Sequence, residues 1–351
     1  MYAIGADIDM VKAVLYALDD KGEPVKEFNK LFRRTRLTED GLRDVREWLL
    51  ESGQEYCILV ENSTKTHHMA WMMESLGIFF IVGHSTDLRQ ITKSDSKTDD
   101  IDAEKLASYM LARLHGANQF HVSYYCDKET MRRRTLCRMA KKTAANKGAC
   151  KRRIRMYAHM FGLTIPSGDL EHVYVRKSVR DIGDLELDMM LDELEQLIER
   201  SKMQKKRIEN EFRGRPIYER ILEIPGFGPI TSAYLDALIC DIGRFPNAKA
   251  FQASLGVVPR VFQSGEKDRN GKITKKGEPH ARWLLYQAVS AHVRDFPDSP
   301  VTRFFNRLND GSIEERKARR EKILMKRDAM IAASRKMAAI IYTLLSKDRH
   351  W

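Results

Sequence analysis

Acidic side chains gather in one short segment, residues 97–103, which reads Lys-Thr-Asp-Asp-Ile-Asp-Ala. An apolar repeat with helical spacing follows at once, so the segment predicts the first turn of a helix over residues 99–114. In that turn Asp99 and Asp102 share a face, while Asp100 points elsewhere. Two converging carboxylates can bind a hard divalent cation, which prefers oxygen ligands. Acids in a first turn can also simply offset the helix macrodipole.

Two further carboxylates lie at the ends of predicted strands. Residues 2–9 form the first strand, which carries Asp7, and Glu61 ends the apolar run 56–61. A sheet that pairs these strands places Asp7 and Glu61 side by side, where ligand sites gather in α/β folds. Four carboxylates would bind one or two Mg²⁺ ions, which can polarise a phosphodiester. Asp9 points to the same face as Asp7 and is the alternative first ligand.

The elements around these acids form an α/β pattern. We expect strands at residues 2–9, 14–18 and 27–33, a helix capped by Thr38, a strand at 56–61, a helix at 67–76, a strand at 78–82 and a helix at 99–114. Hairpin strands followed by alternating helices and strands predict a mixed sheet with helices on its faces. Residues 1–125 are therefore expected to form the first domain.

Charge divides the chain unevenly. The 351 residues carry a net charge of +12, yet residues 1–125 hold 15 Lys/Arg and 20 Asp/Glu, while the remainder holds 46 and 29. A basic excess of this size favours a polyanionic partner, most often nucleic acid. Five scattered cysteines without a Cys-x-x-Cys pair predict reduced thiols in a cytoplasmic protein without a zinc site. No signal peptide and no membrane-spanning segment are expected.

The second region, residues 126–215, is expected to be helical. Residues 131–155 contain eleven Lys/Arg and no acid, which predicts a long basic helix. Without counter-charges such a run repels itself, so contact with nucleic-acid backbone is favoured over a solvated helix face. The predicted contact residues there are Arg132, Arg133, Arg134, Arg138, Lys141, Lys142, Lys151, Arg152 and Arg153. Apolar positions over residues 187–212 predict a coiled-coil seam against this helix or another protomer.

The third region, residues 216–351, is predicted to be mainly α-helical. Residues 224–229 read Ile-Pro-Gly-Phe-Gly-Pro and resemble the hairpin of helix-hairpin-helix DNA-binding modules, with Gly226 and Gly228 facing a phosphate. A turn between two packed helices would need the same glycines. The other residues that we expect to contact nucleic acid are Lys267, Lys272, Lys275, Lys276 and Arg282.

The order of these segments resembles a known family. Residues 4–7, 60–64 and 97–103, followed by 224–229, 255–259, 264–265 and 271–277, are similar to the motifs of DEDD transposases of bacterial insertion sequences. That family includes the Piv-type DNA invertases and the bridge-RNA-guided recombinases, and the resemblance spans about residues 3–345. It implies a RuvC-like N-terminal domain with a ribonuclease H fold, whose metal ligands would be Asp7, Glu61, Asp99 and Asp102.

Two departures from the family pattern stand out. The family usually has a lysine three residues after the first Asp, where this chain has Met10; Lys12 takes that place only if Asp9 is the ligand. Asn62-Ser63-Thr64 also replaces the usual Ala-Thr-Gly. We prefer Asp7, because residues 14–18 then align with the family's second strand without a gap.

The resemblance also implies a chemistry. In this family a C-terminal serine is the nucleophile, and Ser264 matches its position. A serine hydroxyl needs activation, which the carboxylate-bound Mg²⁺ would supply. The implied protein is a DNA transposase or recombinase with a phosphoserine intermediate. Its implied partners are donor and target double-stranded DNA and a structured guide RNA, bound by a dimer or tetramer at the bacterial nucleoid. A hydrolytic RuvC-like Holliday-junction nuclease and a non-catalytic nucleic-acid-binding protein are the alternatives.

Overall fold

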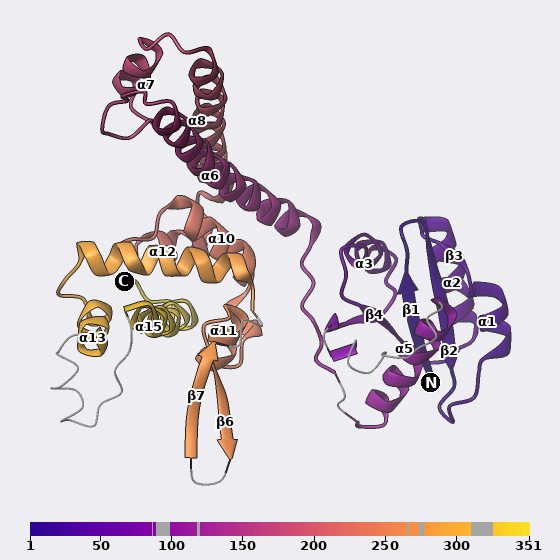
Figure 1. Cartoon of the computed structure of the whole chain (residues 1–351). Helices are drawn as coiled ribbons and strands as arrows, with labels where there is room; N and C mark the ends of the chain where they lie inside the picture. Colours follow the sequence, from indigo (N-terminus) through magenta and orange to yellow (C-terminus); the bar gives the residue numbers. More distant parts are fainter. Residues whose placement is uncertain (86, 89–98, 118–119, 265–266, 274–276, 310–325) are drawn as a thin grey trace. The chain divides into compact units, whose positions relative to one another are not determined.

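The chain divides into two compact units, Met1–Lys128 and Glu129–Trp351, in the computed structural model (Figure 1). The structure describes residues 1–85, 87–88, 99–117, 120–264, 267–273, 277–309 and 326–351. Each unit contains apolar clusters of its own. Burial of these clusters is the main favourable term in folding, so each unit has an independent source of stability.

The N-terminal unit is built on a mixed sheet. Its strands are β1 (Tyr2–Ile8), β2 (Lys12–Leu18), β3 (Thr35–Arg36), β4 (Tyr56–Glu61) and β5 (Phe80–Gly83). Its helices are α1 (Lys26–Phe32), α2 (Glu39–Glu51), α3 (Thr66–Ser75) and α5 (Asp99–Leu114). The strand order is β3-β2-β1-β4-β5, with β1 antiparallel to β2 and parallel to β4. This arrangement is consistent with a ribonuclease H-like DEDD domain, and it confirms the predicted mixed sheet.

Strand β4 shows why helices must cover both faces of the sheet. Successive side chains of a strand point to opposite faces. Ile58 and Val60 pack in the cluster that includes residues of α2 and α3, while Cys57 and Leu59 pack with residues of α5. All four side chains are buried, as expected for a strand in the middle of a covered sheet.

One predicted strand is wrong. Residues 27–33 lie mostly in helix α1, and β3 consists only of Thr35–Arg36. Phe28 and Phe32 are four residues apart and both contact the Trp48 ring of α2, with centroid distances of 5.1 Å and 6.4 Å. That spacing is helical, and packing against Trp48 decides the conformation. Asn29 then bonds both backbone groups of Ala17, at 2.7 Å and 3.1 Å, where a strand would otherwise pair.

The C-terminal unit begins with a helical arm. Figure 1 shows α6 (Lys128–Met160) and α8 (Leu185–Phe212) side by side, with α7 (Val173–Arg180) at their far end. The predicted basic helix is thus confirmed as part of α6. Near the far end Ile154 of α6 packs with Leu187 and Leu191 of α8, so the apolar positions of α8 are covered there by this same chain.

The rest of the C-terminal unit is mainly helical, as predicted. Its helices are α9 (Pro216–Leu222), α10 (Pro229–Ile239), α11 (Ala248–Ser254), α12 (Pro279–Asp295), α13 (Pro300–Asn309) and α15 (Lys326–Ser346), with a short 3-10 turn η1 (Ile242–Arg244). An antiparallel hairpin of β6 (Pro259–Ser264) and β7 (Lys267–Ile273), which the sequence analysis did not predict, separates α11 from α12.

Helix α15 corrects the prediction that no segment could span a membrane. Residues 327–346 are long and apolar enough to cross one, by length and composition only. Ala329, Ala333, Met337 and Ile341 of this helix are fully buried in the core of the C-terminal unit. Core packing therefore accounts for the apolar side of α15.

Candidate functional site

The predicted carboxylates come together at the carboxyl ends of strands β1 and β4 of the N-terminal sheet. In the parallel pairing of β1 and β4, Ala6 lies opposite Val60, so Asp7 and Glu61 follow as neighbours. Helix α5 begins at Asp99 and crosses β1 closely at Gly5. A Cβ atom at Gly5 would lie 2.0 Å from the backbone oxygen of Ala103, so only glycine permits this approach.

Asp7 lies in the electric field of the other three acids. The pKa of Asp7 rises from 3.8 to about 6, first because the side chain is buried and then because Asp99, Asp102 and Glu61 are negatively charged. Burial and like charges both disfavour the ionised carboxylate. The four acids therefore form one electrostatic group contributed by three separate elements, the arrangement that the sequence predicted.

Asp9 has a different environment from Asp7. Its Oδ1 atom accepts a hydrogen bond from Nζ of Lys65 at 2.7 Å, and this bond is the main cause that lowers the pKa of Asp9. Lys65 follows Glu61 by four residues and precedes α3, and the sequence analysis missed it. Its ammonium group also feels the charges of Asp7 and Asp99, so it lies at the border of the acidic group.

The other acids at the start of α5 have partners of their own. Asp100 accepts hydrogen bonds from Nε and Nη2 of Arg33 at 3.0 Å and 2.8 Å. That pairing confirms that Asp100 points to a different place from Asp102 and takes no part in the acidic group. Lys12 Nζ lies 3.8 Å from Oδ2 of Asp99, while Met10, which stands where the family has lysine, is 74% exposed.

The chemistry of the acidic group fits a hard divalent cation, since every predicted ligand is a carboxylate oxygen. Within the described residues, no three His, Cys, Asp or Glu side chains are already arranged around one ion position. The four acids are thus close enough to repel one another without forming a tight cluster. A bound cation would relieve the repulsion that raises the pKa of Asp7.

Many charges of α6 are used inside the chain. Within the arm, ion pairs join Arg133 to Glu211 (3.0 Å), Lys147 to Glu171 (2.8 Å), Lys151 to Asp169 (2.8 Å) and Arg153 to Glu193. Arg134 donates from Nε to the backbone oxygen of Ala237 at 2.8 Å, at the end of α10. Acids and carbonyl groups of the chain therefore supply part of the counter-charge that the basic run needs.

The remaining basic residues of α6 differ from one another. Arg132 pairs with Glu129 at 2.5 Å, and Arg138 lies 3.6 Å from Glu278. Lys142 and Arg152 are exposed and form no hydrogen bond or ion pair within the described part of the chain. Of the α6 residues predicted to contact nucleic acid, those two remain the most available to an external phosphate.

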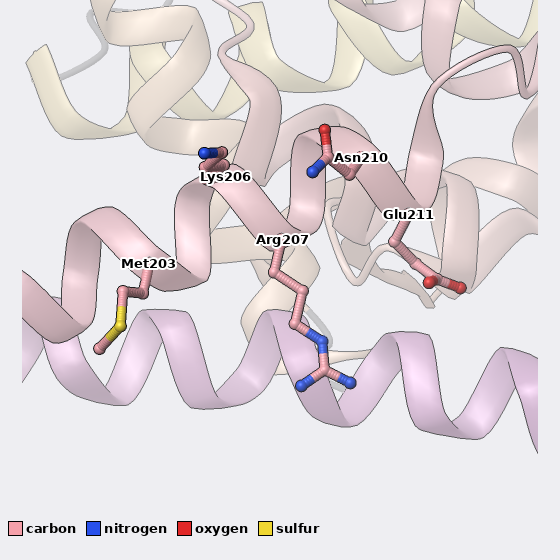
Figure 2. A pocket seen from close by; sticks show the side chains of 5 residues that line it. All are labelled: Met203, Lys206, Arg207, Asn210 and Glu211. Carbon is pink, nitrogen blue, oxygen red and sulfur yellow. The ribbon is translucent and has the colours of Figure 1, made fainter.

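A basic pocket on α8 was missed by the sequence analysis. Its volume is about 400 Å³, and its lining residues are Met203, Lys206, Arg207, Asn210 and Glu211. Figure 2 shows Met203 and Arg207 extending in the same direction from α8 and Lys206 in another. The acid in this set, Glu211, is already bonded to Arg133, so the remaining charges are positive. Lys206 and Arg207 precede Ile208 and are not among the apolar positions of the predicted seam.

The glycine-rich turn has a packing role at one of its two glycines. Gly226 has a φ of +88°, and a Cβ atom there would lie 2.6 Å from the backbone oxygen of Ala288 on α12. Gly226 therefore permits a close contact between helices, the alternative noted for this motif. Gly228 caps the start of α10, and a Cβ atom there would meet nothing within 4 Å.

Ser264 ends β6, and its Cα pairs with that of Lys267 across the hairpin. The structure describes the backbone alone for Ser264, Lys267 and Lys272. Lys275 and Lys276, like Lys97 and Thr98 of the acidic segment, lie outside the described residues. Nη1 of Arg282 lies 3.5 Å from the backbone oxygen of Gly256, which ties the start of α12 to the residues before β6.

Two regions of the chain match known protein families. Residues 4–158 match the DEDD transposases of the IS110 type, and residues 218–303 match the transposase family IS116/IS110/IS902. The two matches together span more than half of the 351 residues. The chain is therefore of the transposase class, the class of DNA recombination enzymes with a DEDD domain. It belongs to the IS110/IS116 family of insertion-sequence transposases.

Individual relatives point the same way. A "Probable family 20 transposase" of Pseudomonas aeruginosa is 30% identical over 48% of this chain and 46% of its own length. The "Transposase for insertion sequence element IS1328" of Yersinia enterocolitica is 23% identical over 83% of this chain and 84% of its own. The "Transposase for insertion sequence element IS1111A" of Coxiella burnetii is 31% identical over 37% and 33%. The chain thus spans about half or less of two of these relatives and most of the third.

Proposed function

We propose that this chain is a Mg²⁺-dependent DNA transposase in which Asp7, Glu61, Asp99 and Asp102 hold the metal. The observation that carries the proposal is the raised pKa of Asp7, caused by its burial and by three other acids from two further elements. Such a perturbed carboxylate is typical of functional sites. Mg²⁺ bound there would polarise a phosphodiester and stabilise negative charge on its oxygens.

Asp7, and not Asp9, is the proposed first ligand. The carboxylate of Asp9 is already bonded to Lys65 at 2.7 Å, whereas Asp7 is surrounded by acids. Binding a cation at Asp9 would first require the loss of this ion pair. We assign Lys65 and Lys12 to the border of the site, where an ammonium group can neutralise part of the charge of a DNA phosphate.

Ser264 is the proposed nucleophile. Its Oγ forms a bond to the phosphorus of a DNA phosphodiester, the bond from phosphorus to one DNA oxygen breaks, and that oxygen leaves as a hydroxyl with the proton from the serine. Because the phosphoserine retains the bond energy, a DNA hydroxyl can reverse the step and reseal a strand without ATP. The support is the position of Ser264 among the family motifs in residues 218–303.

The proposed partners are nucleic acids. Donor and target double-stranded DNA are the substrates, and a structured non-coding RNA is the guide. We assign the backbone contacts to exposed cations such as Lys142, Arg152, Lys206 and Arg207. Residues 1–125, 126–215 and 216–351 serve as the catalytic, arm and serine domains of a dimer or tetramer that acts at the bacterial nucleoid.

A covalent adduct tests the proposal. Wild-type protein, Mg²⁺, the element's RNA and labelled donor DNA should give a protein–DNA band that survives denaturing electrophoresis. Ser264→Ala should remove this band while DNA binding persists. Ser254→Ala is the matched control, because the Ser254 hydroxyl is bonded to the backbone oxygen of Phe251 at 2.7 Å, and it should keep the band. Cleavage without any adduct in the wild type would favour the hydrolytic nuclease, and an adduct with Ser264→Ala would assign the reaction to another hydroxyl.

A further inference from the structure

Trp283 on α12 lies on the side of the helix that faces away from the core. Its neighbours Ala281, Leu284 and Leu285 are buried, whereas Trp283 remains 45% exposed. An indole ring is costly to leave in water, because it is one of the largest apolar surfaces that a side chain can offer. Packing of the core therefore does not explain why tryptophan stands at this position.

The surroundings of the Trp283 ring are cationic. Nζ of Lys141 on α6 lies 4.8 Å from the ring centroid, a cation–π contact. Lys141 is half-buried, and this burial lowers its pKa, while Glu278 acts in the opposite direction. Glu278 is the acid in this group, and Arg138 at 3.6 Å and His280 at 3.4 Å both lie against it. Glu278 also accepts a hydrogen bond from Tyr234 at 3.0 Å, so its carboxylate is fully engaged.

The start of α12 is tied to the base of the β6–β7 hairpin. The backbone N–H of Glu278 donates to the oxygen of Ser254 at 3.0 Å, and Nη1 of Arg282 lies 3.5 Å from the oxygen of Gly256. These contacts fix the first turns of α12, which carry Trp283, beside the residues that lead into β6. The ring thus lies on a part of the chain whose position relative to the base of this hairpin is set by direct bonds.

We propose that Trp283 is a stacking site for an unpaired nucleobase, with Lys141 contacting a neighbouring phosphate. In a duplex both faces of each base are covered by its neighbours, so an outward-facing indole can stack only on a base that is single-stranded or flipped out. DNA and RNA share this chemistry. The inference rests on the proposed nucleic-acid function and assigns a particular contact for unpaired nucleotides to the C-terminal unit.

Trp351 provides a matched control within the same unit. It is 42% exposed, close to the value for Trp283, but it lines a pocket of about 320 Å³ that also contains the exposed Asp298 and Asp295, which pairs with Arg294. Acidic surroundings repel a phosphate backbone, whereas Lys141 attracts it. The two tryptophans therefore differ in the charge around the ring and only slightly in exposure.

Binding of labelled oligonucleotides to the full-length protein tests the inference. Single-stranded DNA and RNA of about 12 nucleotides, a length within the usual site size, and the matching DNA duplex are compared by fluorescence anisotropy. Trp283→Leu keeps an apolar side chain but removes the aromatic face, so it should weaken binding of the single strands about tenfold, as expected for one lost base stack. Duplex binding should change less than twofold. Trp283→Phe should restore most of the affinity, and Trp351→Leu should change nothing.

A second readout does not depend on the fold of the leucine variant. A single strand should quench the tryptophan emission of the wild type and of Trp351→Phe, but should quench Trp283→Phe much less. The single strand that binds more tightly, DNA or RNA, identifies the source of the unpaired base. Unchanged single-strand affinity in Trp283→Leu, or equal loss for duplex and single strand, overturns the stacking site while leaving the proposed function intact. Failure of the wild type to bind any of the three probes overturns both.

Discussion

The acidic group of the N-terminal sheet and the basic helix α6 both concentrate charges of one sign. They differ in whether those charges have partners of opposite sign within the chain. On α6, Lys151 bonds to Asp169 and Glu171, both at 2.8 Å. Burial raises the pKa of Glu171, but the hydrogen bonds from Lys147 and Lys151 outweigh it and lower that pKa, and the bond from Lys151 lowers the pKa of Asp169. Around Asp7 the neighbours are other acids, and the pKa of Asp7 rises to about 6. Part of the charge of α6 is thus neutralised within the chain, whereas the acidic group keeps its repulsion.

This difference separates structural charges from functional ones. A charge with an internal partner helps to hold elements together, as Lys147 and Lys151 hold the segment before α7 against α6. A cluster of like charges destabilises the fold unless a ligand of opposite charge binds. The electrostatics therefore place the strongest demand for an external partner at Asp7 and a weaker one along α6.

The largest expected effect is on strand cleavage. Asp7→Asn should reduce Mg²⁺-dependent cleavage by more than about 100-fold, since loss of even an outer partner of a metal site costs about 10- to 100-fold. Asp9→Asn, two residues away, should cost far less because Asp9 is bonded to Lys65. Single-turnover cleavage of labelled donor DNA measures both variants. Equal loss in the two variants, or a larger loss in Asp9→Asn, would reverse the assignment of the first ligand.

Substitution of Gly5 tests whether the close packing of α5 on β1 brings the four acids together. Gly5→Ala should destabilise the N-terminal unit by about 3 kcal/mol, because the new Cβ would overlap the backbone of α5, and overpacking costs about 1–3 kcal/mol in general. As α5 moves away from β1, the pKa of Asp7 should fall toward its usual value. Urea unfolding and NMR titration of the carboxylates check these outcomes. Gly53→Ala is a control without a packing clash: a Cβ at Gly53 would meet nothing within 4 Å, so the strain of alanine at a φ of +61° is its main cost, and the pKa of Asp7 should not change.

The repulsion at Asp7 should appear in the pH dependence of stability. The pKa of Asp7 is about 6 in the folded state, whereas the usual value of an aspartate, expected in the unfolded chain, is 3.8. The contribution of Asp7 to the free energy of unfolding is therefore present below about pH 4 and is lost as the pH rises through 6. In the absence of metal, Asp7→Asn should therefore raise the free energy of unfolding at pH 7.5 by about 1–3 kcal/mol. At pH 4 the gain should vanish. Urea unfolding with EDTA at both pH values measures it, and a gain that is independent of pH would contradict the electrostatic cause.

The smallest effect distinguishes two neighbouring arginines on α6. Arg152 is exposed without a partner in the described residues, whereas Arg153 pairs with Glu193. Arg152→Gln should reduce the salt dependence of DNA binding by about one unit of slope, as for one lost phosphate contact. Arg153→Gln should reduce it less, because that guanidinium is partly neutralised. Fluorescence anisotropy across a salt series gives both slopes. Equal slopes would contradict the proposed difference between Arg152, unpaired in the described part of the chain, and the paired Arg153.

The amino-acid sequence by itself determined the elements that carry the acids. The continuous apolar run of β4 and the helical repeat after Asp99 can be read from local sequence, and the ordered motifs match the family found for residues 4–158. The cap of α2 by Thr38, which accepts from the N–H of Gly41 at 3.2 Å, could be predicted in the same way. Such features depend on residues within a few positions of one another.

Tertiary structure alone decided the features that depend on distant residues. Residues 27–33 became a helix because Phe28 and Phe32 meet Trp48, and Asp9 differs from Asp7 because Lys65 reaches it across 56 residues of chain. The acids that neutralise α6, and Lys141 beside Trp283, are likewise far away in the sequence. Coulomb forces and side-chain packing act over a few ångströms in space, so a linear pattern can indicate which charges exist but not which of them are paired.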